Sequence, residues 1–95
     1  MDAGSAVINL TTQWEDAVLS FGEYLELERG RSAHTVRAYT GDLVDLGRHS
    51  CRRGIVDPAN LTLQELRAWL ADLDRRGVAR ATVARRAAAA RSFTA

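Results

Sequence analysis

Residues 32–46 read SAHTVRAYTGDLVDL, and this stretch decides the fold. Ser32 is a common N-terminal cap of helices, because its hydroxyl accepts a hydrogen bond from a free amide of the first turn. Apolar side chains then recur at helical spacing along one face, at Val36, Tyr39, Leu43 and Leu46. The stretch predicts a helix over residues 32–53. Gly41 and Gly47 lie inside it and either permit close packing of another helix or mark fraying.

Toward the N-terminus, a second helix is predicted over residues 12–29. Thr12 and Glu15 have the spacing of a capping box, in which each side chain accepts a hydrogen bond from the backbone amide of the other residue. One apolar stripe follows, made of Trp14, Val18, Phe21 and Leu25. Gly30 is a natural C-terminal stop for this helix. Residues 1–11 are predicted to form a flexible leader.

Toward the C-terminus, Asp57 and Pro58 mark a turn, after which a third helix is predicted over residues 62–76. This helix opens with a second capping box, from Thr62 to Glu65. Its predicted apolar face consists of Leu63, Leu66, Trp69, Leu70 and Leu73. The two tryptophans of the chain are expected to anchor the core, each with an indole N–H that needs an acceptor.

A fourth helix, composed mainly of Ala and Arg, is predicted over residues 80–94. Its core stripe is expected to consist of Val83, Ala87, Ala90 and Thr94. Arg85 falls on the opposite face, together with Ala89. Because Ala buries little apolar area, this helix must lean closely on the others. Four helices without a convincing strand predict an all-α domain.

The composition excludes several classes of protein. The chain has 95 residues, enough for one domain, and is 46% hydrophobic, enough for one small core. Its sequence has no apolar run that could span a membrane and no signal-peptide pattern. A single cysteine, Cys51, cannot form an internal disulfide and favours a reducing, cytoplasmic setting. With one Cys and two His, no metal site is expected, and no cofactor is predicted.

The net charge of +1 hides a strong segregation of charge along the chain. Residues 1–28 carry six acids and no Arg, and residues 54–74 carry four acids and one Arg. Residues 29–53 carry six Arg and two acids, and residues 75–95 carry six Arg and no acid. Arg suits phosphate groups and base edges, so the second and fourth predicted helices are the candidates for contact with DNA. The acidic first helix is expected to face solvent or a partner.

Two stretches of the chain carry a family resemblance. Residues 32–43, SAHTVRAYTGDL, resemble the S-x-x-T-x-x-A-Y-x-x-D-L signature of the N-terminal core-binding domain of tyrosine recombinases. Residues 82–93, TVARRAAAARSF, are similar to the T-x-x-R-x-L-S-A-L-R-x-F helix of the same domain. The chain departs from that second pattern with Ala at several Leu and Ser positions, and Ala79 stands where the family has a capping residue. The resemblance covers residues 14–95.

The resemblance implies a four-helix, SAM-like orthogonal bundle of the phage-integrase N-terminal type, with the binding domain at residues 12–95. It implies that the helices at 32–53 and 80–94 cross the major groove of a double-stranded recombination half-site. The first helix would contact partner recombinase protomers, in DNA integration or chromosome dimer resolution. The strand-cleaving residues would belong to a C-terminal domain absent from this chain, so no catalytic residue is predicted here. The isolated domain is expected to be a monomer.

The candidate DNA-binding residues gather at the starts of the two basic helices and along the fourth. They are Ser32, His34, Thr35, Arg37, Arg80, Thr82, Arg85, Arg86 and Arg91. Ser32 and Thr35 place hydroxyls at a helix N-terminus, a natural phosphate seat. Arg86 could instead pair with an acid of a neighbouring helix. Asp42 is expected to organise Arg or backbone groups, and neither tyrosine has the neighbours of a nucleophile.

Two alternatives remain open on the sequence. The chain could be a helical protein–protein interaction module without DNA binding, because SAM-like bundles serve both purposes. It could also be a helix-turn-helix regulator, since a short turn at Gly77 joins the third and fourth helices, although no dimer-forming element is visible.

Overall fold

The structure is a computed structural model that describes residues 10–95. In this part of the chain it contains four α-helices, one short 3-10 helix and no strand. The elements are α2 (Thr12–Leu27), α3 (Ala33–Arg52), η1 (Pro58–Asn60), α4 (Leu63–Arg75) and α5 (Arg80–Thr94). The all-α prediction is confirmed, and η1 is a feature that the sequence pattern had indicated only as a turn.

Side-chain caps explain where three of the helices begin. The Ser32 hydroxyl accepts from the Thr35 amide at the start of α3, and the Thr62 hydroxyl accepts from the Glu65 amide at the start of α4, as predicted. The cap of α2 was predicted one residue too late, because the Thr11 hydroxyl, not that of Thr12, accepts from the Trp14 amide. Thr11 is also held by its own hydroxyl, which donates to the Val56 carbonyl over 2.6 Å.

The start of α2 also corrects the predicted leader. Leu10 is 8% exposed and belongs to the core, and Thr11 caps the helix, so the leader does not extend to residue 11. Residues 1–9, the remainder of that predicted leader, lie outside the described residues.

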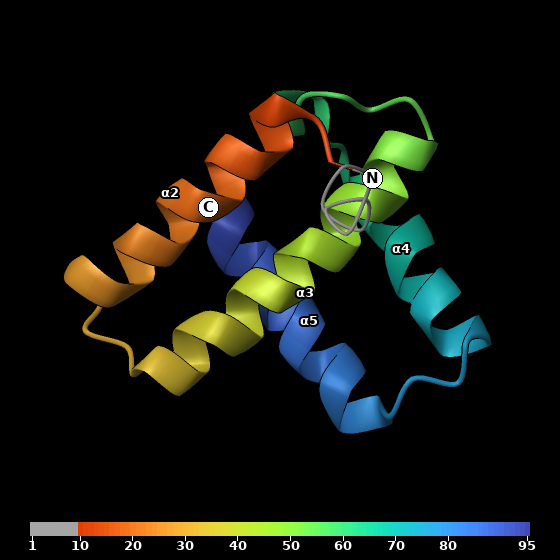
Figure 1. Cartoon of the computed structure of the whole chain (residues 1–95). Coiled ribbons are helices and arrows are strands. Elements are labelled where there is room, and N and C mark those ends of the chain that lie inside the picture. The colour runs from red at the N-terminus through yellow and green to blue at the C-terminus, as the bar shows by residue number, and fades with distance from the viewer. Residues whose placement is uncertain (1–9) are drawn as a thin grey trace, which may run out of the picture.

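Helix α3 is the centre of the bundle, with α2 packed along it and α5 crossing behind it in the view of Figure 1. Helix α4 packs against both α3 and α5. The fully buried apolar side chains at the centre come from all four helices: Trp14, Leu43, Leu46, Trp69, Leu73 and Ala89. Trp14 donates from Nε1 to the Ile55 carbonyl over 3.0 Å, which supplies the acceptor that its indole requires.

Gly47 permits the close approach of α3 to the start of α2. A Cβ atom at this position would lie 2.7 Å from Leu10 Cδ2 and 3.1 Å from Trp14 Cε3. Gly41 has open space around its Cα instead. Of the two explanations for these glycines, close packing is therefore correct for Gly47 alone.

The predicted core face of the last helix was wrong in part. Ala89, assigned to the outward face, is fully buried, and Ala90 is 4% exposed as expected. Phe93 stacks on Trp14 with ring centroids 6.0 Å apart and meets Phe21 edge-on at 5.7 Å. Because α5 touches three other helices, its buried surface wraps around it and does not follow one stripe.

One residue of the predicted α4 face is also misplaced. Leu63 is 61% exposed, whereas Trp69 and Leu73 are fully buried and Leu66 and Leu70 pack beside them. Leu63 is the first residue of α4. At this position the apolar face of the helix does not yet lie against the bundle. Ala79, which precedes α5, makes no side-chain capping hydrogen bond.

His49 gives the fold a predictable dependence on pH. Its side chain is buried in α3, and its Nε2 atom has no hydrogen-bond partner within residues 10–95. Burial lowers the pKa of His49, the charges of Arg53 and Arg52 lower it further, and Asp72 and Glu65 oppose them. The imidazole therefore takes up a proton less readily in the folded than in the unfolded chain.

We expect the free energy of unfolding to be constant above the unfolded pKa of about 6.5 and to fall as the pH drops below it, because the unfolded state then binds the proton first. Urea midpoints measured from pH 8 to pH 5.5 test this. His49→Gln should flatten the profile, and the exposed His34→Gln serves as the comparison variant. A decline that persists in His49→Gln would assign it to another group.

Candidate nucleic-acid interface

The candidate residues at the start of α3 form one small polar group. Ser32 is the N-cap, and its hydroxyl donates to the Thr35 hydroxyl over 3.1 Å while accepting from the Thr35 amide over 3.2 Å. His34 and Arg37 are exposed beside it. These four candidates therefore lie within the first two turns of α3, at the end where the positive pole of the helix favours an anion.

The middle of α3 carries a buried carboxylate that binds two of the candidate arginines. Arg85 donates to Asp42 from Nε over 2.9 Å and from Nη2 over 2.7 Å, a bidentate pair. Arg86 donates from Nε to the same carboxylate over 3.1 Å. Asp42 is 1% exposed, so this is the buried ionic contact between α3 and α5. The expectation that Asp42 organises Arg is confirmed.

Arg85 therefore does not point away from the bundle as the helical projection had predicted. Its side chain, 41% exposed, reaches Asp42 of α3 instead. The hydrogen bond to Asp42 raises the pKa of the guanidinium, which stays charged. Two of its five N–H groups are used by Asp42, and both hydrogens of Nη1 and one of Nη2 remain for a ligand.

Asp45 extends the same network to α4. Its Oδ2 accepts from Trp69 Nε1 over 2.8 Å and from Arg76 Nη2 over 2.9 Å, and Arg86 Nη1 lies 3.3 Å away. Partial burial alone would raise the pKa of Asp45, but the hydrogen bonds from Trp69 and Arg76 and the charges of Arg76 and Arg86 lower it. Arg86 is thus paired with two acids of the neighbouring helix, which was the alternative left open for it.

The other arginine candidates are free of such contacts. Arg37, Arg80 and Arg91 are exposed, and none of them forms an ion pair within residues 10–95. Thr82 is half-buried in the first turn of α5, two residues after Arg80. Within residues 10–95, no hydrogen bond or ion pair joins the polar group at the start of α3 to these residues of α5, so the candidates form two groups.

Sequence reasoning missed Asp45, Trp69 and Arg76 as parts of one network. The available signal was the pair of acids at positions i and i+3 within an otherwise basic segment, which places both carboxylates on one helix face. The buried indole of Trp69, which needed an acceptor, was the other half of that signal. The packing of α4 on α3 decides which of the two acids accepts from the indole of Trp69, and that acid is Asp45.

Other kinds of site find little support in the described chain. No group of His, Cys, Asp and Glu side chains within residues 10–95 could hold a metal ion. None of the helices in that range is long and apolar enough to cross a membrane.

Comparison with known proteins supplies a family. The family model of the phage integrase N-terminal SAM-like domain matches residues 18–95. The chain belongs to this family. A search of the solved structures finds no match to it.

Among the curated relatives of this SAM-like domain are XerC tyrosine recombinases. That of Mycobacterium sp. (strain KMS) is 49% identical over 82 residues, which are 85% of this chain and 27% of the relative. That of Mycobacterium tuberculosis (strain CDC 1551 / Oshkosh) is 52% identical over 75 residues, 79% of this chain and 25% of the relative. The chain thus spans about a quarter of the length of the recombinases it matches, and corresponds to their N-terminal SAM-like domain.

The ion pairs of this SAM-like domain join the two stretches on which the family resemblance rests. Asp42 belongs to the first stretch, and Arg85 and Arg86 belong to the second. More than forty residues apart in sequence, they meet in one buried contact between α3 and α5. The resemblance is therefore carried in part by residues that hold the two basic helices together.

Proposed function

We propose that this chain is the DNA-binding, core-binding domain of a XerC-like site-specific tyrosine recombinase. It grips one half-site of a double-stranded recombination site through the major groove, with α3 and α5 as the contacting helices. The parent recombinase acts in DNA integration or in the resolution of chromosome dimers. The residues that cleave and rejoin the strand are supplied by a part of the recombinase that this chain does not contain.

This proposal rests on one observation: the acids of α3 are paired inside the bundle, whereas several arginines of α3 and α5 are exposed. The two acids of α3 turn into the bundle, where Asp42 and Asp45 are neutralised by arginines. Arg37, Arg80 and Arg91 remain exposed on the same two helices without an acidic partner in residues 10–95. The outward charge of α3 and α5 is therefore positive, as contact with phosphates requires.

Arg85 has a second role in this proposal. Its Nη1–Nη2 edge is free of Asp42 and has the fork geometry that matches a phosphate or the O6 and N7 atoms of guanine. Because Asp42 holds the guanidinium from its Nε side, the edge is fixed before DNA arrives. Ser32, His34, Thr35 and Thr82 contribute phosphate contacts at the helix starts, and Arg86 acts mainly through its acids.

The partners of the parent protein follow from the same proposal. Helix α2 carries acids and no Arg, so DNA repels it and a protein can approach it. The parent recombinase would assemble with other recombinase protomers of the XerD type, in the cytoplasm, while the isolated domain remains a monomer.

Titration with a duplex that contains a recombination half-site tests the proposal. In NMR spectra, chemical-shift changes should cluster at residues 32–40 and 78–92. Arg85→Ala should weaken binding by about 1–3 kcal/mol if it contacts a base. Arg37→Ala should weaken binding similarly on all sequences and lower the salt slope by about 1, as expected for one lost phosphate contact.

The matched control is Arg53→Ala, because this exposed arginine lies at the C-terminal end of α3 and pairs with Glu65. It should leave the affinity and the salt slope nearly unchanged. Shifts confined to α2, or no binding even at low salt, would reject DNA binding and favour the interaction module.

A further inference from the structure

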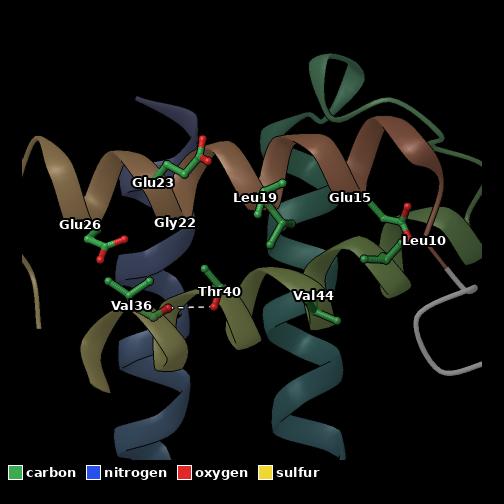
Figure 2. Close-up of a pocket in the computed structure, with 10 residues that line it drawn as sticks. Leu10, Glu15, Leu19, Gly22, Glu23, Glu26, Val36, Thr40 and Val44 are labelled. Carbon is green, nitrogen blue, oxygen red and sulfur yellow. Dashed lines mark hydrogen bonds between the residues drawn. The ribbon is translucent and has the colours of Figure 1, made fainter. Parts of the chain in front are cut away.

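A groove with a volume of about 520 Å³ runs between α2 and α3. Its floor is formed by Leu10, Val18, Gly22, Val36, Thr40 and Val44. Figure 2 shows Val36, Thr40 and Val44 on the part of α3 that lies below α2, with α4 and α5 behind them. No residue of α4 or α5 lines the groove, so it opens on a side of α3 away from the contact with Arg85.

The two helices meet closely at Gly22, within the floor of the groove. A Cβ atom there would lie 3.1 Å from Thr40 Cγ2 and 3.8 Å from Val36 Cγ1. The hydroxyl of Thr40 turns away to the backbone, where it donates to the Val36 carbonyl over 2.8 Å. Thr40 therefore presents its methyl group to the groove, and the whole floor offers hydrocarbon to a ligand.

Carboxylates border this floor along α2. Glu15 lies toward one end, Glu26 toward the other, and Glu23 between them (Figure 2). None of the three forms an ion pair within residues 10–95. Eleven residues of helix separate the first from the last, a rise of about 16 Å, or three turns.

Leu19 stands in the middle of this border. It is 66% exposed, although it is a large apolar side chain. In Figure 2 it points from α2 toward α3, beside the groove. It lies four residues after Glu15 and four before Glu23, one helical turn from each. The pattern along α2 is therefore acid, apolar, acid, acid, with the Glu26 carboxylate turned toward α3 and that of Glu23 on the outer side of α2 in Figure 2.

We propose that this groove binds an amphipathic helix of a partner protein, about three turns long, with an apolar stripe toward the floor and Lys or Arg toward α2. Such a helix in a groove is a recurrent mode of recognition. Charge complementarity favours it over DNA, which the carboxylates repel. Residues 1–9 of this chain contain no Lys or Arg and so lack the complementary charges. The inference does not depend on DNA binding, because it rests on an apolar floor and the carboxylates of α2, which are not among the proposed DNA contacts.

NMR titration of the 95-residue chain tests the proposal with two synthetic peptides. One is a Leu/Lys peptide of about 14 residues patterned as an amphipathic helix, and the other has Glu in place of every Lys. The Leu/Lys peptide should shift the amides of α2 and the first half of α3, and the Leu/Glu peptide should not. Equal binding of both peptides, or shifts mainly on α4, would overturn the proposal.

Variants separate the apolar and the charged contributions. Glu23→Gln combined with Glu26→Gln should weaken the Leu/Lys peptide about fivefold, as expected for two exposed ion pairs. Leu19→Gln should weaken it about tenfold, since it removes exposed apolar area without disturbing the core. Glu28→Gln, also exposed on this acidic segment but outside the groove, is the matched control and should bind normally.

Two further results would show a different occupant and overturn the proposal. Concentration-dependent dimerisation that Leu19→Gln abolishes would mean that a second copy of this chain fills the groove. If removal of residues 1–9 shifts the amide signals of the groove and raises the affinity for the peptide, the groove is occupied by this chain's own N-terminal residues. Unchanged peptide binding after that removal supports a separate partner.

Discussion

Replacing Asp42 with alanine is expected to lower the free energy of unfolding by about 2–3 kcal/mol, close to the cost of removing one partner of a buried ion pair. The carboxylate is 1% exposed and accepts three hydrogen bonds, two from Arg85 and one from Arg86. Within residues 10–95, its loss removes the acid partner of Arg85 and leaves Arg86 with Asp45 alone. The cost stays below that of a fully buried pair because the Arg85 side chain is 41% exposed and can turn to water.

Urea denaturation monitored by tryptophan fluorescence measures this loss. Asp16→Ala is the matched control, because Asp16 is exposed on α2 and has no ion-pair partner in residues 10–95, so its change should stay within about 0.5 kcal/mol. Asp42→Asn should cost less than Asp42→Ala, since one amide oxygen still accepts from Arg85. Equal stability of Asp42→Ala and the parent chain would show that the network is not needed to join α3 to α5.

The same variant connects stability to the proposed function. If Asp42 fixes the free edge of Arg85, Asp42→Asn should weaken DNA binding while the domain stays folded. If Asp42→Ala unfolds the domain but Asp42→Asn binds DNA normally, Asp42 has only a structural role.

Helix positions could be predicted from the sequence because their signals are local. Ser32 and Thr62 cap the helices that they were expected to cap, and α5 spans the predicted residues 80–94. These signals depend on hydroxyls, glycines and apolar spacing within one or two turns. The cap of α2 was misplaced by one residue because Thr11 and Thr12 are chemically equal candidates, and the choice depends on the contact of Thr11 with the distant Val56.

The partners of the helices could not be predicted in the same way. Arg85 was placed outward because a single projection of α5 assumes one buried face, whereas α5 packs on three helices. The basic character of α3 and α5 was evident from the segment charges, but which arginines were neutralised was not. That outcome depends on where Asp42 and Asp45 meet α5 and α4, over separations of 24 to 44 residues.

A second large effect on the free energy of unfolding is expected at Gly47 of α3, and Gly41 of the same helix serves as its control. Gly47→Val is expected to lower the free energy of unfolding by about 3 kcal/mol, at the upper end of the cost of overpacking a core. Its Cβ would lie 2.7 Å from Leu10 Cδ2, which can move, and 3.1 and 3.3 Å from the ring of Trp14, which is buried and held by Ile55. The two methyl groups of Val add to a contact that is already too short.

Alanine at the two positions separates helix propensity from packing. Each substitution gains about 1 kcal/mol of helix propensity over Gly. Gly41→Ala meets open space, so it should stabilise the domain by about that amount, whereas Gly47→Ala meets Leu10 and Trp14 and should be destabilising. Thermal and urea unfolding of both variants give the difference directly. If both stabilise the chain equally, α2 does not pack on Gly47 as closely as the structure shows, and the placement of Leu10 in the core would be wrong as well.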